Sequence, residues 1–190
     1  MATAKKTPRR KATTGASRTS AKPETRARAR PPASGESDAI ELLTEDHRKV
    51  DELFEEYESA KEEASDGDKE ELVAEICLEL TVHASVEEEV FYPAAREALD
   101  EEELHLLDEA EVEHEHIKML VEELKTMTAG EPLYDAKVKV LSEYVKHHVE
   151  EEEGEIFPTV RDADLDVEAL GDQLRARKEQ MMAELQVEES

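Results

Sequence analysis

Hydrophobic residues recur at intervals of three and four along most of the chain, which is the pattern of amphipathic helices. Glycine, proline and acidic turn sequences interrupt the pattern. It predicts five helices: from a cap at Ser37 to the turn at 65–68, through Leu72 to Pro93, from Asp100 to Gly130, from about Val138 to Pro158, and from about Val167 to Leu185. No stretch alternates as a half-buried strand does, so we expect an all-α protein.

The first four predicted helices are long and have short connections. Such helices favour an up-down-up-down four-helix bundle, here over residues 38–160. The additional C-terminal helix, over residues 165–187, is expected to pack on or beside the bundle. Residues 2–36 contain no Leu, Ile, Val, Phe, Tyr or Trp. Because they cannot bury enough apolar surface to offset the entropy of ordering, residues 1–36 are predicted to form a disordered basic tail.

Charge divides the chain in the same place. Residues 1–36 carry ten basic and two acidic residues, a net charge of +8, and the remainder carries 14 basic and 49 acidic residues, a net charge of −35. A body this acidic is not expected to approach nucleic acid or an anionic membrane through its own surface. The tail is open to three interpretations: a solubilising or spacer arm, a DNA contact, or transient docking on the acidic body.

Several features favour a cytoplasmic protein. No apolar run is long enough to span a membrane, and the first 36 residues lack the apolar core of a signal peptide and the amphipathic pattern of a presequence. The single cysteine, Cys77, excludes a disulfide framework and a multi-cysteine metal site. It lies in an apolar helical stretch, so we expect a reduced, partly buried thiol.

An internal repeat relates the two halves of the predicted bundle. The first and third helices read alike around a histidine, as DHRKVDELFEE at 46–56 and EHEHIKMLVEE at 113–123. The second and fourth read alike as HASVEEEVFYP at 83–93 and HVEEEEGEIFP at 148–158. In the first pair an acidic residue precedes the histidine, and in the second pair glutamates follow it after four and five residues. The repeating unit is therefore a two-helix hairpin that repeats polar as well as apolar residues.

Helical phase indicates which of these polar residues face the core. At about 100° per residue, His83 and Glu87 fall within about 20° of the centre of the apolar stripe on the second helix. His148 and Glu152 have the same phases on the fourth helix, and the first and third helices each place one histidine on the stripe. We therefore expect six polar residues inside the bundle: His47, His83, Glu87, His114, His148 and Glu152. Three histidines fall outside the stripes and are expected on the surface: His105, His116 and His147.

Six such donors in one core predict a metal site. A buried carboxylate costs on the order of several kcal/mol unless it is paired or coordinated. Hydrogen bonds could explain one His–Glu pair, but they explain poorly the same pair occurring twice with two further histidines. Imidazole and carboxylate four residues apart on facing helices suit two first-row cations bridged by the carboxylates. Six ligands are excessive for structural zinc, so iron is expected and manganese remains an alternative. Glu88 and Glu153 are expected to be hydrogen-bonding partners of the ligands.

The pattern His47, His83-x3-Glu87, His114, His148-x3-Glu152, with an aromatic residue and proline ending the second and fourth helices, resembles the hemerythrin-like (HHE cation-binding) family. The resemblance covers about residues 38–160. It implies a four-helix bundle with a non-haem di-iron site that is oxo- or hydroxo-bridged. It also implies that Glu87 and Glu152 bridge the irons, with His47 and His83 on one and His114 and His148 on the other.

One departure from this family affects the expected reactivity. The oxygen-carrying hemerythrins have a second histidine four residues away on the third helix, where this chain has Ala110 and Lys118. The site is therefore expected to be one imidazole short. Our hypothesis is that the additional open position favours redox turnover of O2, peroxide or NO over reversible oxygen carriage.

The resemblance implies a protein that binds or reacts with O2, peroxide or NO, in oxidative or nitrosative stress or in gas or iron sensing. Two alternatives stay open at this point. One is a di-iron oxidoreductase with peroxidase- or catalase-like or NO-consuming activity. The other is an iron storage or handling protein, or a DNA-associated metal protein that acts through its basic tail. The sequence does not separate an enzyme from a binding protein, and it leaves the oligomeric state open.

Overall fold

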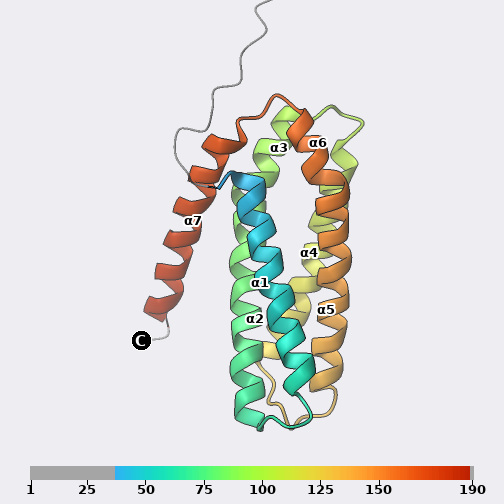
Figure 1. Cartoon of the computed structure of the whole chain (residues 1–190), viewed down its shortest axis with the longest axis vertical. Helices are drawn as coiled ribbons and strands as arrows, with labels where there is room; N and C mark the ends of the chain where they lie inside the picture. Colours follow the sequence, from blue (N-terminus) through green and yellow to red (C-terminus); the bar gives the residue numbers. More distant parts are fainter. Residues whose placement is uncertain (1–36, 189–190) are drawn as a thin grey trace, which may run out of the picture. The chain divides into compact units, whose positions relative to one another are not determined.

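Antiparallel helices lying side by side form a four-helix bundle, with a further helix on its outside (Figure 1). The computed structural model describes residues 37–188, all within the unit Ser34–Ser190. The predicted disordered tail, and with it any DNA contact through the tail, lies outside the described residues. Every regular element within them is helical, which confirms the all-α prediction. None of these helices is long and apolar enough to cross a membrane.

The bundle is built from two single helices and two composite ones. In chain order the elements are α1 Ala39–Ala60, α2 Asp66–Val86, the π-helical turn η1 Glu87–Phe91, α3 Tyr92–Ala98, α4 Leu104–Lys125, α5 Tyr134–Glu151, the π-helical turn η2 Glu152–Ile156, α6 Phe157–Asp162 and α7 Val167–Glu188. The elements α2, η1 and α3 follow one another without a break, as do α5, η2 and α6. The first, second, third and fourth predicted helices therefore correspond to α1, α2–α3, α4 and α5–α6.

The N-cap of the first helix lies one residue later than the cap predicted at Ser37. Asp38 is the N-cap: its carboxylate accepts a hydrogen bond from the Glu41 N–H at 2.9 Å, and the Glu41 carboxylate accepts one from the Asp38 N–H at 3.1 Å. This reciprocal capping box needs an acidic or amide side chain three residues after the cap. Ser37 has Ile40 at that position, so it cannot form the box.

Pro93 and Pro158 do not end their helices as the sequence suggested, because a π-turn precedes each of them. The N–H of Tyr92 bonds to the carbonyl of Glu87, and the N–H of Phe157 to that of Glu152, both five residues back. In a regular α-helix a proline ring clashes with the carbonyl four residues earlier. The wider turn relieves this clash, so each helix continues past its proline, to Ala98 and Asp162. The extra residue also rotates everything after the turn by about 100°.

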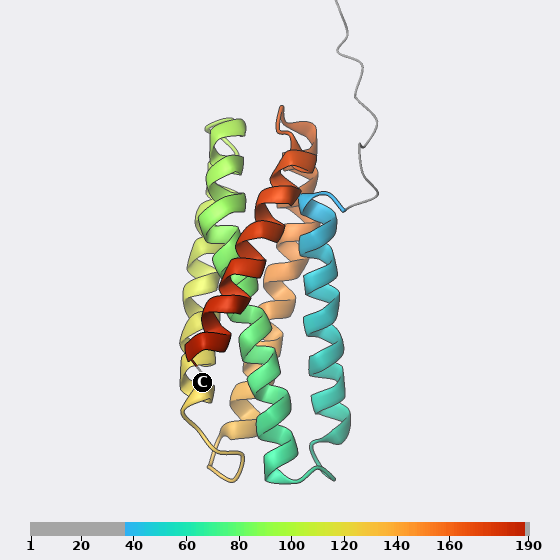
Figure 2. The ribbon, with the colours of Figure 1, turned by 90° about the vertical axis from the view of Figure 1, so that its left-hand side faces the viewer.

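The C-terminal helix α7 packs against the outside of the bundle, on α1 and α2. Figure 2 shows α7 crossing obliquely in front of α2, beside α1. Its buried residues are Leu170, Leu174 and Met181. Gly171 allows the close approach, because a Cβ there would lie 3.0 Å from backbone atoms of Ser37, Asp38 and Ala39. A side chain at this position would therefore push α7 away from the start of α1.

Buried apolar residues form two clusters, one on each side of a polar layer. One cluster includes Leu43 of α1, Ala110 of α4 and the residues that follow the π-turns. The other includes Val50 of α1, Ile117 of α4 and the central parts of α2 and α5. On each helix of the bundle the inward histidine lies in sequence between residues of the two clusters, and Glu87 and Glu152 follow one turn after His83 and His148. Cys77 belongs to the second cluster as a free thiol, and burial raises its pKa to about 11.

Candidate metal centre

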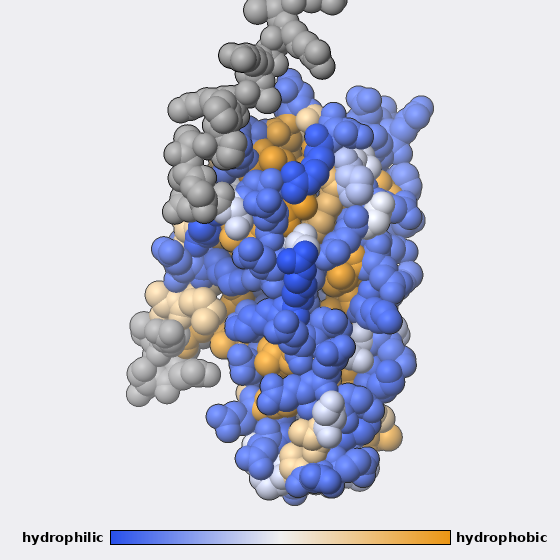
Figure 3. All heavy atoms as spheres, in the orientation of Figure 1, coloured by the Kyte–Doolittle hydropathy of each residue, from blue (hydrophilic) through white to orange (hydrophobic). Residues whose placement is uncertain are grey.

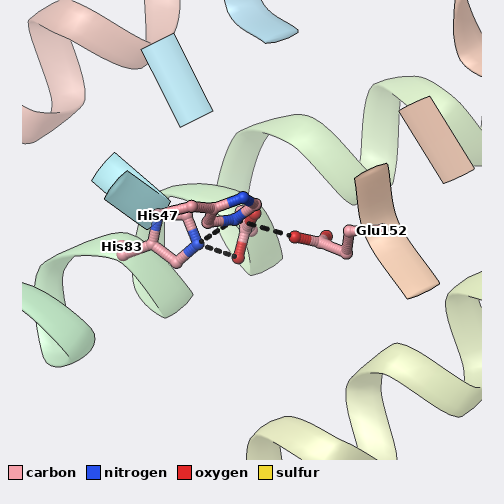
Figure 4. Close-up of side chains that lie close together, drawn as sticks. His47, His83 and Glu152 are labelled. Atoms are coloured by element: carbon pink, nitrogen blue, oxygen red, sulfur yellow. Dashed lines mark hydrogen bonds and ion pairs between the residues drawn. The ribbon is translucent and has the colours of Figure 1, made fainter. Parts of the chain in front are cut away.

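The structure brings the six predicted inward residues together from all four helices of the bundle. Each of them is nearly inaccessible to solvent, and Glu87 and Glu152 are fully buried: His47, His83, Glu87, His114, His148 and Glu152. The remaining histidines are exposed, as helical phase predicted: His105, His116 and His147. Figure 4 shows part of the centre, with the rings of His47 and His83 turned towards each other and the carboxylate of Glu152 pointing at them.

The four histidines form two pairs through the same ring nitrogen. The Nε2 atoms of His47 and His83 lie 3.1 Å apart. Those of His114 and His148 lie 3.0 Å apart. Each pair joins the two helices of one sequence repeat, α1 with α2 and α4 with α5. The centre therefore has the approximate two-fold symmetry of the repeat.

The two buried glutamates connect one pair to the other. The Glu87 Oε2 atom lies 3.2 Å from His83 Nε2 and 3.3 Å from His114 Nε2. The Glu152 Oε2 atom lies 3.2 Å from His47 Nε2 and 3.5 Å from His148 Nε2. Each carboxylate thus touches one histidine from each half of the bundle. These contacts define two groups that could hold a metal ion, one at His47, His83, Glu87 and Glu152 and one at Glu87, His114 and His148.

A second ring of carboxylates lies against the outer nitrogens of the histidines. His47 Nδ1 is 2.9 Å from Glu153 Oε1, and His114 Nδ1 is 2.9 Å from Glu88 Oε1. His148 Nδ1 is 2.8 Å from Glu113 Oε2, and His83 Nδ1 is 3.7 Å from Asp46 Oδ2. An ionised carboxylate only accepts hydrogen bonds, so it favours the proton on Nδ1 and leaves the Nε2 lone pair facing inward.

Two members of this outer ring were expected from the sequence and two were not. Glu88 and Glu153 were predicted as partners of the ligands, and the structure places them there. Asp46 and Glu113 were missed, although the sequence contained a signal for them. They are the acidic residues that precede the histidine in both copies of the repeat.

The two halves of the centre differ in two respects. Asp46 also bonds to Lys178 of α7, and its distance to His83 is longer than a hydrogen bond. The other difference comes from one position of the repeat, where the first copy has Tyr92 and the second has Phe157. The Tyr92 hydroxyl donates a hydrogen bond to Glu152 Oε1 at 2.8 Å. Phe157 has no hydroxyl and stacks on the ring of His47, with centroids 5.7 Å apart.

Tyr92 was not predicted as part of the site, because an uninterrupted helix would turn it away. Sixteen residues after Ile76, its phase at about 100° per residue is about 160° from the stripe. The π-turn at 87–91 removes about 100° of this rotation and brings the ring into the core, where it is buried. The same turn therefore allows Pro93 within the helix and places a hydroxyl on Glu152.

The electrostatics of the site favour a positive charge between the donors. Burial lowers the pKa of His47, but the facing Glu152 outweighs this effect and the pKa rises to about 9. Burial lowers the pKa of His83 to about 4, and the positive charge of His47 acts in the same direction. Burial and the neighbouring Glu152 raise the pKa of Glu87 well above its usual value. Burial also acts to raise the pKa of Glu152, but the surrounding histidines, His148 first, bring it below its usual value.

Hydrogen bonds among the donor residues do not satisfy all of their buried polar atoms, whereas a bound metal ion would satisfy the carboxylate oxygens. Among the described residues, both oxygens of Glu87, Glu152 Oε2 and His83 Nδ1 are buried and lack a hydrogen-bond partner. Glu87 Oε2 is near two ring nitrogens, yet neither contact has hydrogen-bond geometry. Buried polar atoms are normally satisfied, so such a group calls for an explanation. Imidazole and carboxylate groups that converge on one point and leave buried oxygens unsatisfied are the arrangement of a first-row metal site.

Comparison with known proteins identifies the family. The model of the hemerythrin HHE cation-binding domain matches residues 38–160. The chain belongs to this family. The match spans α1 to α6 and therefore contains all six buried donors and the outer carboxylates. It confirms the resemblance inferred from the histidine and glutamate spacing, and it supports a metal-binding role for the cluster.

A solved structure and a sequence relative are similar to the chain over different extents. A hemerythrin HHE cation-binding domain-containing protein from Mycobacterium kansasii has a similar fold, with a TM-score of 0.62 and 26% sequence identity, over 76% of this chain and 86% of that one. A protein named DNA nickase from Nostoc sp. (strain PCC 7120 / SAG 25.82 / UTEX 2576) is 32% identical over 122 residues. That match covers 64% of this chain and 33% of the relative, so the chain spans about a third of the relative's length.

Ala110 and Lys118 have structural roles in this chain. They lie four residues before and after His114, where the oxygen-carrying hemerythrins have a second histidine. Ala110 is buried in the apolar cluster next to the centre. Lys118 points outward and its Nζ lies 2.7 and 2.8 Å from the two carboxylate oxygens of Glu88. Neither side chain adds an imidazole to the centre, and Lys118 helps to hold the carboxylate that orients His114.

Proposed function

We propose that the chain is a non-haem di-iron protein of the hemerythrin type that binds or reacts with O2, peroxide or NO. The observation that carries this proposal is the position of Glu87 and Glu152, each between one histidine of each pair. In the proposed centre both carboxylates would hold the two ions together with the histidines. His47 and His83 would hold one ion, and His114 and His148 the other.

The donor set supports iron over the other common metals. Structural zinc takes four ligands, commonly with thiolate, and calcium and magnesium prefer oxygen alone. Paired imidazoles with shared carboxylates in a helical bundle are typical of di-iron and di-manganese proteins. Two iron ions at this position would supply redox chemistry and a coordination site for a small ligand. Manganese fits the same donors and is the alternative that the metal analysis below distinguishes.

The chain's own residues orient the donors and keep water out. The carboxylates of Glu88, Glu113 and Glu153 fix three imidazoles through Nδ1, and such outer partners are commonly worth 10- to 100-fold, approximately, in metal affinity. The hydroxyl of Tyr92 fixes the orientation of Glu152. The apolar clusters on both sides of the polar layer limit access of solvent to the donors.

Metal analysis with an optical spectrum of aerobically purified protein tests the proposal. We expect two iron ions per chain and the near-ultraviolet bands of an oxo- or hydroxo-bridged pair. The physical reason is that two half-sites share two carboxylates, so loading of one without the other leaves unbalanced buried charge. Manganese in place of iron would support the alternative metal. One zinc per chain, or protein that folds and takes up no metal, would contradict the proposal.

The fate of O2 distinguishes turnover from carriage. Because no further imidazole comes from position 110 or 118, we expect the diferrous protein to be oxidised on mixing with O2 instead of binding it reversibly. Stopped-flow absorption of anaerobically reduced protein measures this. A spectral change that reverses fully when O2 is removed would contradict turnover. Repeated consumption of peroxide or NO by substoichiometric protein would identify an enzyme.

A further inference from the structure

A groove runs along the surface of the bundle between α1 and α5. Its volume is about 420 Å³. In Figure 3, apolar atoms show between the hydrophilic side chains of this face, in the region where Figure 1 places α1 and α5. The groove is lined by His47, Arg48, Asp51, Phe54, Glu55, Tyr57, Glu58, Val138, Lys139, Ser142, Val145, Lys146, Val149, Glu150 and Glu153.

The groove has an apolar strip within a charged rim, and its volume is larger than a diatomic ligand needs. Phe54 contributes an aromatic ring from α1, and α5 contributes Val138, Val145 and Val149. These side chains on α5 are short, with Ser142 between them, so the two helices leave space instead of interdigitating. A water-sized molecule takes up about 30 Å³, and the groove holds roughly ten times this volume or more. Its size is that of sites for small organic ligands.

Two unpaired cations line this groove from opposite helices, one on α1 and one on α5. Residues 37–188 contain 14 lysines and arginines, and all but two form an ion pair with a carboxylate: Lys49, Lys61, Lys69, Arg96, Lys118, Lys125, Lys137, Lys139, Arg161, Arg175, Arg177 and Lys178. Within this described range, Arg48 and Lys146 are the two that form no ion pair or hydrogen bond. In a body with 49 acidic residues, such cations are unusual, and both line the same groove.

The groove adjoins the candidate metal centre. A narrow inner pocket is lined by all four inward histidines, and it shares His47, Val145 and Val149 with the groove. These three side chains therefore contact both the groove and the pocket between the histidines. A molecule held in the groove would therefore lie beside His47.

We propose that this groove binds an organic monocarboxylate with an apolar body, with its carboxylate between Arg48 and Lys146 and its apolar part along Phe54, Val138 and Val145. Guanidinium and ammonium groups recognise a carboxylate through charge-assisted hydrogen bonds. The acidic residues that also line the groove, among them Asp51 and Glu150, disfavour ligands with two or more negative charges. The proposal concerns a ligand site on the protein surface and does not depend on which metal the centre holds.

Calorimetric titration of the full-length protein with decanoate tests this assignment. We expect saturable binding at one site per chain, and weaker binding of decanol, which has the same apolar chain without the charge. Decanol binding as tightly as decanoate, or no saturable binding of decanoate, would overturn the proposal. The heat of binding can be measured with or without iron in the centre. If the protein takes up no iron but binds decanoate, only the proposed function is contradicted. Iron-loaded protein that does not bind it contradicts the groove alone.

Paired variants locate the site. The double variant Arg48→Ala/Lys146→Ala is expected to weaken decanoate binding by roughly 10- to 100-fold, the scale of charge-assisted hydrogen bonds. The matched control Lys125→Ala/Lys137→Ala removes two cations that lie outside the groove and should bind as the wild type does. Ser142→Phe fills the groove without changing charge and is expected to abolish binding. Equal affinities for the two double variants would overturn the assignment.

Discussion

Replacing His148 with alanine is expected to remove iron from the protein, whereas replacing its neighbour His147 should leave the iron content unchanged. His148 is buried, and its Nε2 faces His114 Nε2 at 3.0 Å. Its loss removes one of the two imidazoles of that half-site. The expected loss of metal affinity exceeds the roughly 10- to 100-fold that removal of an outer partner costs.

His147 is a strict control because it is adjacent to His148 on the same helix but lies on the surface of the bundle. It is exposed, and its Nε2 lies 3.5 Å from Glu113 and 3.3 Å from Glu151 on the surface. Iron per chain after identical purification, with circular dichroism to verify folding, compares the two variants. Equal iron loss in both, or full iron retention in folded His148→Ala, would contradict the proposed ligand set.

Replacing Glu87 with leucine is expected to stabilise the metal-free protein and to abolish its stabilisation by metal. Glu87 is fully buried, and both of its oxygens lack a hydrogen-bond partner among the described residues. Exchanging a whole buried ion pair for apolar groups of similar volume often stabilises a fold by about 1–4 kcal/mol. Glu87 can be exchanged alone because its loss leaves no hydrogen-bond partner unpaired. In the wild type, metal binding should instead raise the free energy of unfolding, by about 2.7 kcal/mol per site at roughly 100 times the Kd.

Urea unfolding under chelating and ferrous anaerobic conditions measures both effects. Glu155→Leu is the matched control, because Glu155 lies in the other π-turn and is exposed. Its free energy of unfolding should stay within about 0.5 kcal/mol of the wild type under both conditions. A metal-free Glu87→Leu protein that is less stable than metal-free wild type would show that Glu87 has a stabilising partner other than metal.

The inward histidines and glutamates could be predicted because helical phase is a local property. His148 and His147 differ by one residue, and therefore by about 100° around the helix, whatever the rest of the chain does. The structure buries the first and exposes the second. The repeat then indicated that the same polar residues recur in the second hairpin. The helices and their order followed from this periodic information, and the spacing of the histidines and glutamates carried the resemblance to the family.

Tyr92 shows where local phase fails. A regular helix would place it away from the core, and the π-turn before Pro93 rotates it inward onto Glu152. The sequence shows the proline, but a proline at this point can either end the helix or follow a widened turn within it. Packing of the following residues in the apolar cluster around Phe91 and Ala95 decides for the second. Backbone strain and core burial had to be weighed together, which requires the neighbouring helices.

The six residues that point into the bundle, and their pairing in two repeated hairpins, follow from the sequence alone. Only the tertiary structure decides which atoms meet across helices. It places Glu87 and Glu152 between the histidine pairs, Asp46 and Glu113 against outer ring nitrogens, and a groove beside His47. The reason is physical: the direction of a side chain depends on its own helix. Its partner depends on the spacing and relative height of two helices, which the packing of the whole core sets.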